Sequence, residues 1–367
     1  MTTIPTSASA EELEGLGDSD DSSWGEYPID TVLIRTEPRT VFEILRRIEK
    51  GSFVMDPDFQ RDFIWPEEVQ SKLIESVLMR IPLPVFYLAE DSEGRMVVVD
   101  GLQRLSTFQR FCTGKLPLKL PGQSELDGKR FDELAPKLQN RIEDCNLTLY
   151  IIDAKVHERA RLDIFERVNS GAPLTRQQMR NCLYSGASTR FLKEEAGTDV
   201  FREATGGSIN IKTMRDREFV NRFCAFQLLE IELYKGDMDD FLALALTEMN
   251  KKSTSELERL SQQFRDSLAN NYSIFDNHAF RKHKKPDDRR SVLNASLWDV
   301  MSTGLASYSV SDVARCAASS RAGFYRLMCD KEFVDVITYG PNDARKVKRR
   351  FAMARAMFEE VFRADAT

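Results

Sequence analysis

The chain has 367 residues, of which 42% are hydrophobic, and its 13 Pro and 18 Gly are ordinary numbers. This composition excludes a fibrous or wholly disordered chain and leaves room for about two domains. No apolar run approaches the roughly 18 residues that a membrane-spanning helix needs. The N-terminus lacks a basic region followed by an apolar stretch, so we expect a cytoplasmic protein with no membrane partner.

The net charge of −6 is unevenly distributed along the chain. Residues 1–30 carry eight acidic side chains and no Lys or Arg, which leaves 52 basic and 50 acidic side chains for residues 31–367. We therefore predict an acidic, disordered tail over residues 1–30, followed by a nearly neutral folded part. A strongly basic DNA-binding protein is excluded, while local basic patches remain open.

Strand and helix patterns alternate between residues 31 and 185. Helical spacing of apolar residues, together with Gly and Pro at the ends, predicts helices over 38–50, 66–80, 101–113, 158–171 and 175–186. Alternating or continuous apolar runs predict strands over 85–91 and 95–100, which form a hairpin, and over 147–153.

The strand signals vanish beyond about residue 188. Helical periodicity predicts helices over 217–233, 293–308 and 345–364, and a capping box of Ser253 and Glu256 predicts another from residue 254. The expected class is thus α+β, with a mixed domain over residues 31–185 and an all-helical domain over residues 186–367.

The stretch VVVDGLQRLSTF, residues 97–108, joins a buried strand to a helix. Gly101 permits a tight turn, and the first N–H groups of the helix, which lack intrahelical partners, favour an anion. Arg104 could add a fork of donors to phosphate, and Gln103 could orient a water. The alternative stays open at this point: Asp100 caps the helix, and Arg104 is solvated.

The stretches DPDFQRDFIWPEEVQSKLIESVLMRIPLPVFYL, VVVDGLQRLSTFQRFCTGKLPL and IFERVNSGAPLTRQQMRN occur in this order. Together they resemble the N-terminal domain of GmrSD-type modification-dependent restriction enzymes, usually marked by a DGQQR motif. The resemblance covers roughly residues 38–185 and implies a ParB/sulfiredoxin-like fold. It also implies binding of a nucleoside triphosphate, with Mg²⁺ as a candidate companion, and its hydrolysis.

The resemblance assigns residues to this chemistry by position. Asp100, Gly101, Gln103 and Arg104 match the DGQQR motif, in which the resemblance implies a catalytic role for Asp100, Gln103 and Arg104 and a nucleotide-binding role for Gly101 and Arg104. Leu102 departs from the motif, where the family usually has Gln, and this removes one polar group.

Two further motifs would face the same cleft. Gln60 and Arg61 match the family's upstream QR pair, and Asn169 matches an N-x-G motif with Gly171, so the resemblance implies that Gln60, Arg61 and Asn169 bind nucleotide. Alternatively, Asn169 and Gly171 only end a helix.

The chain offers little for metal or nuclease chemistry. Its three His, at positions 157, 278 and 283, do not have zinc-site spacing, so we expect no metal centre and no HNH nuclease domain. The stretch 278–290 is better interpreted as a solvated basic loop.

Two basic clusters are candidates for contact with nucleic acid. Lys284 and Lys285 lie in the first, and Arg349 and Arg350 in the second. They would contact the phosphate backbone of DNA without reading sequence. The alternative is that both clusters are solvated faces.

The sequence thus supports three hypotheses. The first is a protein of DNA restriction or anti-phage defence that binds nucleotide, with DNA and a separate nuclease or defence protein as candidate partners. The second is a non-enzymatic module that binds nucleic acid or a partner through a degenerate pocket. The third is a metal-dependent nickase that uses Asp56, Asp58, Asp100 and Glu166.

Overall fold

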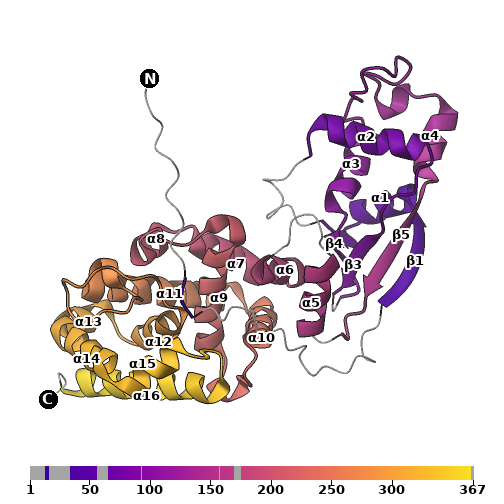
Figure 1. Cartoon of the computed structure of the whole chain (residues 1–367). Helices are drawn as coiled ribbons and strands as arrows, with labels where there is room; N and C mark the ends of the chain where they lie inside the picture. Colours follow the sequence, from indigo (N-terminus) through magenta and orange to yellow (C-terminus); the bar gives the residue numbers. More distant parts are fainter. Residues whose placement is uncertain are drawn as a thin grey trace, which may run out of the picture. The chain divides into compact units, whose positions relative to one another are not determined.

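The computed structural model describes residues 13–15, 34–55, 65–91, 93–156, 158–168 and 175–364. The chain divides into two compact units (Figure 1). One unit comprises Trp24–Leu183, and the other comprises Tyr184–Thr367 together with Met1–Ser23. The division after Leu183 lies next to the predicted boundary between residues 185 and 186.

The first unit is built on a mixed sheet of five strands in the order β1-β5-β3-β4-β2. β3 and β4 form the predicted antiparallel hairpin, β3 runs parallel to β5, β1 is antiparallel to β5, and β2 is parallel to β4. The strands are β1 (Ile34–Thr40), β2 (Phe53–Val54), β3 (Phe86–Glu90), β4 (Met96–Asp100) and β5 (Asn146–Ile152). β4 is therefore an interior strand, as its three valines predict, and Val97, Val98 and Val99 are all buried.

Among the described residues of this unit, six α-helices accompany the sheet: α1 (Val41–Glu49), α2 (Glu67–Leu78), α3 (Leu102–Cys112), α4 (Pro136–Glu143), α5 (Glu158–Val168) and α6 (Arg176–Leu183). A short 3-10 helix spans Phe131–Glu133. Leu105 and Phe108 of α3 are fully buried in the core that includes Val98. The sequence did not predict β1, in which Pro38 is tolerated because β1 is an edge strand, or the short helix α4.

The regular elements among the described residues of the second unit are helices and two isolated β-bridges, which confirms the α+β class with a helical C-terminal part. Its helices are α7 (Ala187–Ala196), α8 (Asp199–Thr205), α9 (Arg215–Leu228), α10 (Met238–Asn250), α11 (Thr254–Phe275), α12 (Ala295–Leu305), α13 (Val310–Arg315), α14 (Ala317–Cys329), α15 (Lys331–Thr338) and α16 (Ala344–Ala364). Short 3-10 helices span Ile211–Thr213, Ile231–Leu233 and Asp276–His278.

The core of the helical unit surrounds Trp298, which is fully buried. Its ring contacts those of Phe219 and Phe280, with centroids 5.1 and 4.6 Å away. The capping box of Ser253 and Glu256 opens α11 as predicted. Among the helices within the described ranges, none has both the length and the apolar character to span a membrane.

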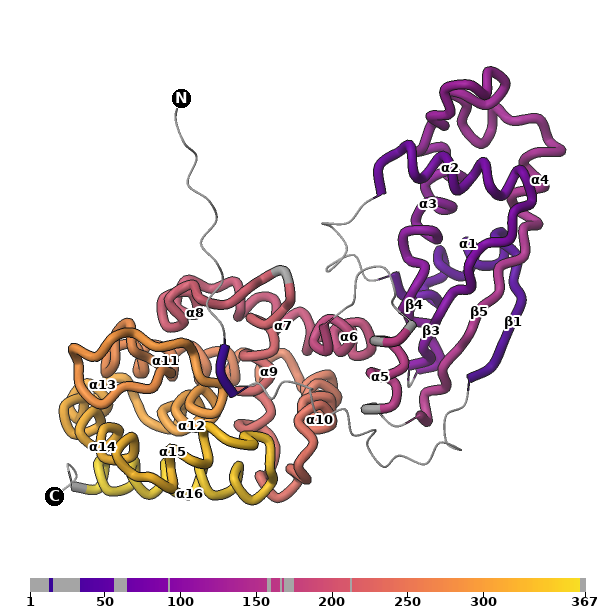
Figure 2. Tube along the Cα trace, viewed as in Figure 1, coloured from indigo at the N-terminus to yellow at the C-terminus, as the bar shows by residue number. Residues whose placement is uncertain are grey.

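Part of the acidic N-terminal segment packs on the helical unit, contrary to the prediction of disorder. Figure 2 shows this piece in indigo among the helices. Glu14 pairs with Asn294 in a parallel bridge: its N–H donates to Leu293 O, and its carbonyl accepts from Ala295 N–H, both at 2.8 Å. Leu13 packs against the helical core, and the Glu14 carboxylate pairs with Lys282. The prediction of disorder is thus wrong for Leu13–Gly15, while the rest of residues 1–30 lies outside the described residues.

Candidate functional site

The turn between β4 and α3 requires glycine. Gly101 has a φ of 100°, in the left-handed region, and it occupies the N-cap position of α3. A Cβ at this position would lie 2.3 Å from Cδ1 of Phe86. The backbone at Gly101 can therefore pass close to Phe86 only because no side chain intervenes, and no side chain of Gly101 caps the first N–H groups of α3.

Arg104 lies under this turn with its guanidinium bound by the protein itself. Nη1 donates to Pro84 O, and Nη2 donates to Val85 O at 3.1 Å and to Asp100 Oδ2 at 2.7 Å. The guanidinium carbon lies 4.2 Å from the centroid of the Phe86 ring, and the residue is only 8% exposed. The geometry thus differs from the expectation that Arg104 presents its donors to phosphate: the side chain ties the start of β3 to α3.

Asp100 contributes a half-exposed carboxylate to the turn. Its side chain is 32% exposed, and Arg104 holds its Oδ2. Within the described part of the chain, Arg104 is the donor that reaches this carboxylate. The carboxylate is therefore fixed in orientation and can still accept a hydrogen bond or a metal ion.

Gln103 fixes the end of the segment that precedes α2. Its Oε1 accepts from the backbone N–H of Trp65 at 3.1 Å, while the carbonyl of Trp65 accepts from Gln70 Nε2. Arg110 of α3 in turn donates to Gln70 Oε1 at 2.8 Å. The amide of Gln103 thus has a structural partner in addition to its predicted role.

The remaining predicted nucleotide-binding residues, Gln60, Arg61 and Asn169, lie outside the described residues. The same holds for Asp56, Asp58 and the side chain of Glu166, which the nickase hypothesis uses. Within the ranges that are described, no three His, Cys, Asp or Glu side chains gather to hold a metal ion.

The predicted nucleic-acid-binding residues fall into two groups by exposure. Lys284 and Lys285 are exposed, and Arg349 is half-exposed and paired with Glu332 through two hydrogen bonds of 2.7 Å. Arg350 is fully buried, where it donates to Pro341 O and shares Asp299 with Arg222. The prediction that Arg350 contacts nucleic acid is wrong, because no surface is left for a ligand.

The stretch 278–290 is only partly the predicted solvated loop. Arg281 is fully buried and donates to Thr205 O and Ser208 Oγ. His283 is 4% exposed, and its ring lies 4.8 Å from the ring of His278. Burial lowers the pKa of His283 below its ordinary value. This prediction is thus wrong for Arg281 and His283, which belong to the interior.

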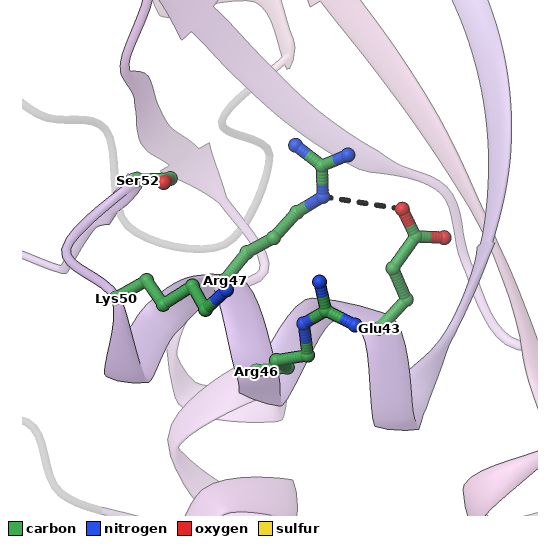
Figure 3. Close-up of a pocket in the computed structure, with 5 residues that line it drawn as sticks. All are labelled: Glu43, Arg46, Arg47, Lys50 and Ser52. Carbon is green, nitrogen blue, oxygen red and sulfur yellow. Dashed lines mark hydrogen bonds and ion pairs between the residues drawn. The ribbon is translucent and has the colours of Figure 1, made fainter.

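A basic hollow at the end of α1 was not predicted. Figure 3 shows its lining residues: Glu43, Arg46, Arg47, Lys50 and Ser52. A signal was present in the sequence, because Arg46, Arg47 and Lys50 lie opposite the buried Val41 and Ile44 on an amphipathic helix.

The first unit is thus a mixed α+β domain in which Gly101, in the left-handed backbone conformation, lies between the interior strand β4 and the helix α3. Residues 41–185 match the family model described as GmrSD restriction endonuclease, N-terminal domain. This part of the chain is therefore a GmrSD-type N-terminal domain, which confirms the resemblance, and it contains the β4–α3 turn. Comparisons with curated proteins and with solved structures give no match.

Proposed function

We propose that the GmrSD-type domain binds a nucleoside triphosphate at the β4–α3 turn and that the protein acts in DNA restriction or anti-phage defence. The family match supports a role in restriction or defence, because the family model is described as a domain of a restriction endonuclease. The observation that carries the nucleotide proposal is the turn itself. Within the described part of the chain no side-chain hydrogen bond caps the opening of α3 at Gly101, and the carboxylate of Asp100 beside it is 32% exposed.

Each residue of the turn has a distinct part in this proposal. Backbone N–H groups in the first turn of α3 would bind phosphate oxygens, aided by the helix dipole. Asp100 Oδ1 would bind Mg²⁺ or a water. Arg104 is a positioning residue, since it donates hydrogen bonds to Asp100 and to the carbonyls of Pro84 and Val85 just before β3. Leu102, which is 5% exposed, belongs to the core and contributes no polar group.

Hydrolysis and the wider assembly are further parts of the proposal. Gln103 would orient a water, with Gln60, Arg61 and Asn169 completing the nucleotide site as the resemblance implies. A separate nuclease or defence protein would supply the cleavage of DNA.

A specific observation favours a second candidate, a module that binds nucleic acid or a partner without hydrolysis. Pro84, Val85 and Asp100 already accept the hydrogen bonds of Arg104 that are described above. Arg104, the side chain best suited to bind phosphate, therefore already donates its hydrogen bonds within the protein, as expected of a degenerate pocket.

Calorimetric titration of the full chain with ATP, GTP, CTP and UTP, each with and without Mg²⁺, separates the two candidates. The nucleotide proposal expects saturable binding of at least one nucleotide below millimolar concentration, strengthened by Mg²⁺. Absence of binding at millimolar concentration, together with binding to DNA alone, would leave the second candidate.

A further inference from the structure

The hollow at the C-terminal end of α1 has a volume of about 360 Å³ and lies within the first unit. Figure 3 shows that Arg46 and Arg47 reach it from α1, Lys50 from the residue that follows α1, and Ser52 from the stretch that leads into β2. The opposite face of α1 is buried through Val41 and Ile44, so the helix is anchored and its basic face is held in place.

The hollow has an excess of positive charge. Glu43 is the only acidic residue among the described residues that line it, and this carboxylate is shared between Arg47, at 3.1 Å, and Arg39. Arg46 and Lys50 are exposed, and no acceptor in the described part of the chain reaches their head groups. Two cations are therefore available to a ligand.

The helix end itself does not oppose an anion strongly. The last carbonyls of α1 already accept hydrogen bonds: Arg46 O from Lys50 N–H at 3.2 Å, Arg47 O from Ser52 N–H at 2.9 Å, and Ile48 O from Gly51 N–H at 3.0 Å. Their negative partial charges are thus partly compensated by these donors.

We propose that this hollow binds phosphate groups of a nucleic-acid backbone, through Arg46 and Lys50 with support from Arg47 and the Ser52 hydroxyl. Among the described residues, its lining contains no aromatic or aliphatic side chain on which a base could stack, so it suits a phosphodiester better than a free nucleotide. Such binding is salt-dependent and does not read sequence. The site is separate from the β4–α3 turn and does not depend on the nucleotide proposal.

The test is fluorescence anisotropy of a labelled 20-base-pair duplex with the full chain, over a series of salt concentrations. The Arg46→Gln/Lys50→Gln variant should bind about 10-fold more weakly or worse. Its slope of log affinity against log salt should be shallower by about 1.8, because each lost duplex phosphate contact contributes about 0.9. The matched control is Lys72→Gln/Lys115→Gln, two exposed lysines of the same unit outside the hollow, which should bind as wild type does.

A second variant is expected to gain affinity for the duplex, a result that a folding defect would not produce. Glu43→Gln removes the carboxylate that Arg39 and Arg47 share at the hollow, so it should bind the duplex more tightly and with a steeper salt slope. The proposal is overturned if Arg46→Gln/Lys50→Gln binds the duplex as wild type does. It is also overturned if this variant loses affinity for nucleoside triphosphates and not for the duplex, because the hollow would then serve a free nucleotide. Titration of Asp100 variants with nucleotide tests the turn separately.

Discussion

Adjacent arginines of α16 have opposite environments. Arg349 is half-exposed and pairs with Glu332, whereas Arg350 is fully buried against Asp299. A buried ion pair that loses one partner leaves an uncompensated charge, while an exposed pair contributes little to stability. The helical period explains the difference, since Val347, Arg350, Ala354 and Met357 recur on one buried face.

We therefore expect Arg350→Ala to lower the free energy of unfolding of the helical unit by about 3–5 kcal/mol. Arg349→Ala should lower it by no more than about 1 kcal/mol. Urea unfolding of both variants, followed by circular dichroism, makes the comparison. Equal losses for the two would contradict the placement of Arg350 in the interior.

His283 should make the helical unit sensitive to acid. Its Nδ1 lies 2.8 Å from Arg281 O and carries the proton of that hydrogen bond, because the carbonyl can only accept. Burial lowers its pKa below the ordinary value of 6.5, His278 and Arg321 act in the same direction, and the bond to Arg281 O and Asp288 oppose them.

The sign follows from proton uptake by the unfolded chain. Below pH 6.5 the unfolded state binds a proton at His283 that the folded state does not, so stability falls as the pH decreases through this value. Thermal unfolding between pH 7.5 and 5.5 should show this fall in wild type and a flatter profile in His283→Asn. Wild-type stability that stays constant over this range would disprove the effect.

At the scale of elements, Arg104 joins the start of β3 to α3 across the sequence. The two carbonyls that accept its hydrogen bonds belong to Pro84 and Val85, which precede the β3–β4 hairpin. Desolvation lowers the pKa of Arg104, while Asp100 raises it. Arg104→Ala should lower the free energy of unfolding of the first unit by about 1.5–3 kcal/mol, the range for hydrogen bonds to a charged group. Lys115→Ala, at an exposed position after α3, is the control and should change it by less than about 0.5 kcal/mol. If Arg104→Ala has the same free energy of unfolding as wild type, the hydrogen bonds of Arg104 do not stabilise the junction.

Local patterns could be predicted from the sequence, and partners distant along the chain could not. The three valines of β4, Gly101 and the period of Leu105 and Phe108 define the strand, turn and helix, and all are observed. Arg104 follows the same turn, but nothing local indicates that the carbonyls of Pro84 and Val85 accept its donors. β1 was missed because its exposed and half-buried residues include Pro38 and show no apolar run.

The segment Leu13–Gly15 is a second case in which a distant partner determines structure. Removing residues 1–15 should lower the melting temperature of the helical unit by several degrees, because two backbone hydrogen bonds of about 1 kcal/mol each and the packing of Leu13 are lost. Removing residues 1–11 is the control, and the difference between the two truncations isolates the docked segment. Identical melting temperatures would show that its docking adds nothing to stability.

At the scale of the whole molecule, two units with separate hydrophobic cores carry different features. The first unit contains the β4–α3 turn and the basic hollow, and the second contains the buried Arg222–Asp299–Arg350 network and the docked segment. The acidic charge of residues 1–30 accounts for the negative net charge of the chain. Both sites proposed above lie in the first unit, whereas the exposed Lys284 and Lys285 lie in the second.

Calorimetry of Asp100→Asn tests whether the β4–α3 turn binds a nucleotide with the help of Asp100. The amide oxygen of Asn can still accept from Arg104, so the fold should be kept while the charge that would bind Mg²⁺ is lost. We expect the variant to bind nucleotide at least about 10-fold more weakly than wild type in the presence of Mg²⁺, a loss of about 1.4 kcal/mol. Asp132→Asn, at an exposed position of the same unit, should bind as wild type does. Equal affinities of wild type and Asp100→Asn with Mg²⁺ would contradict the proposal.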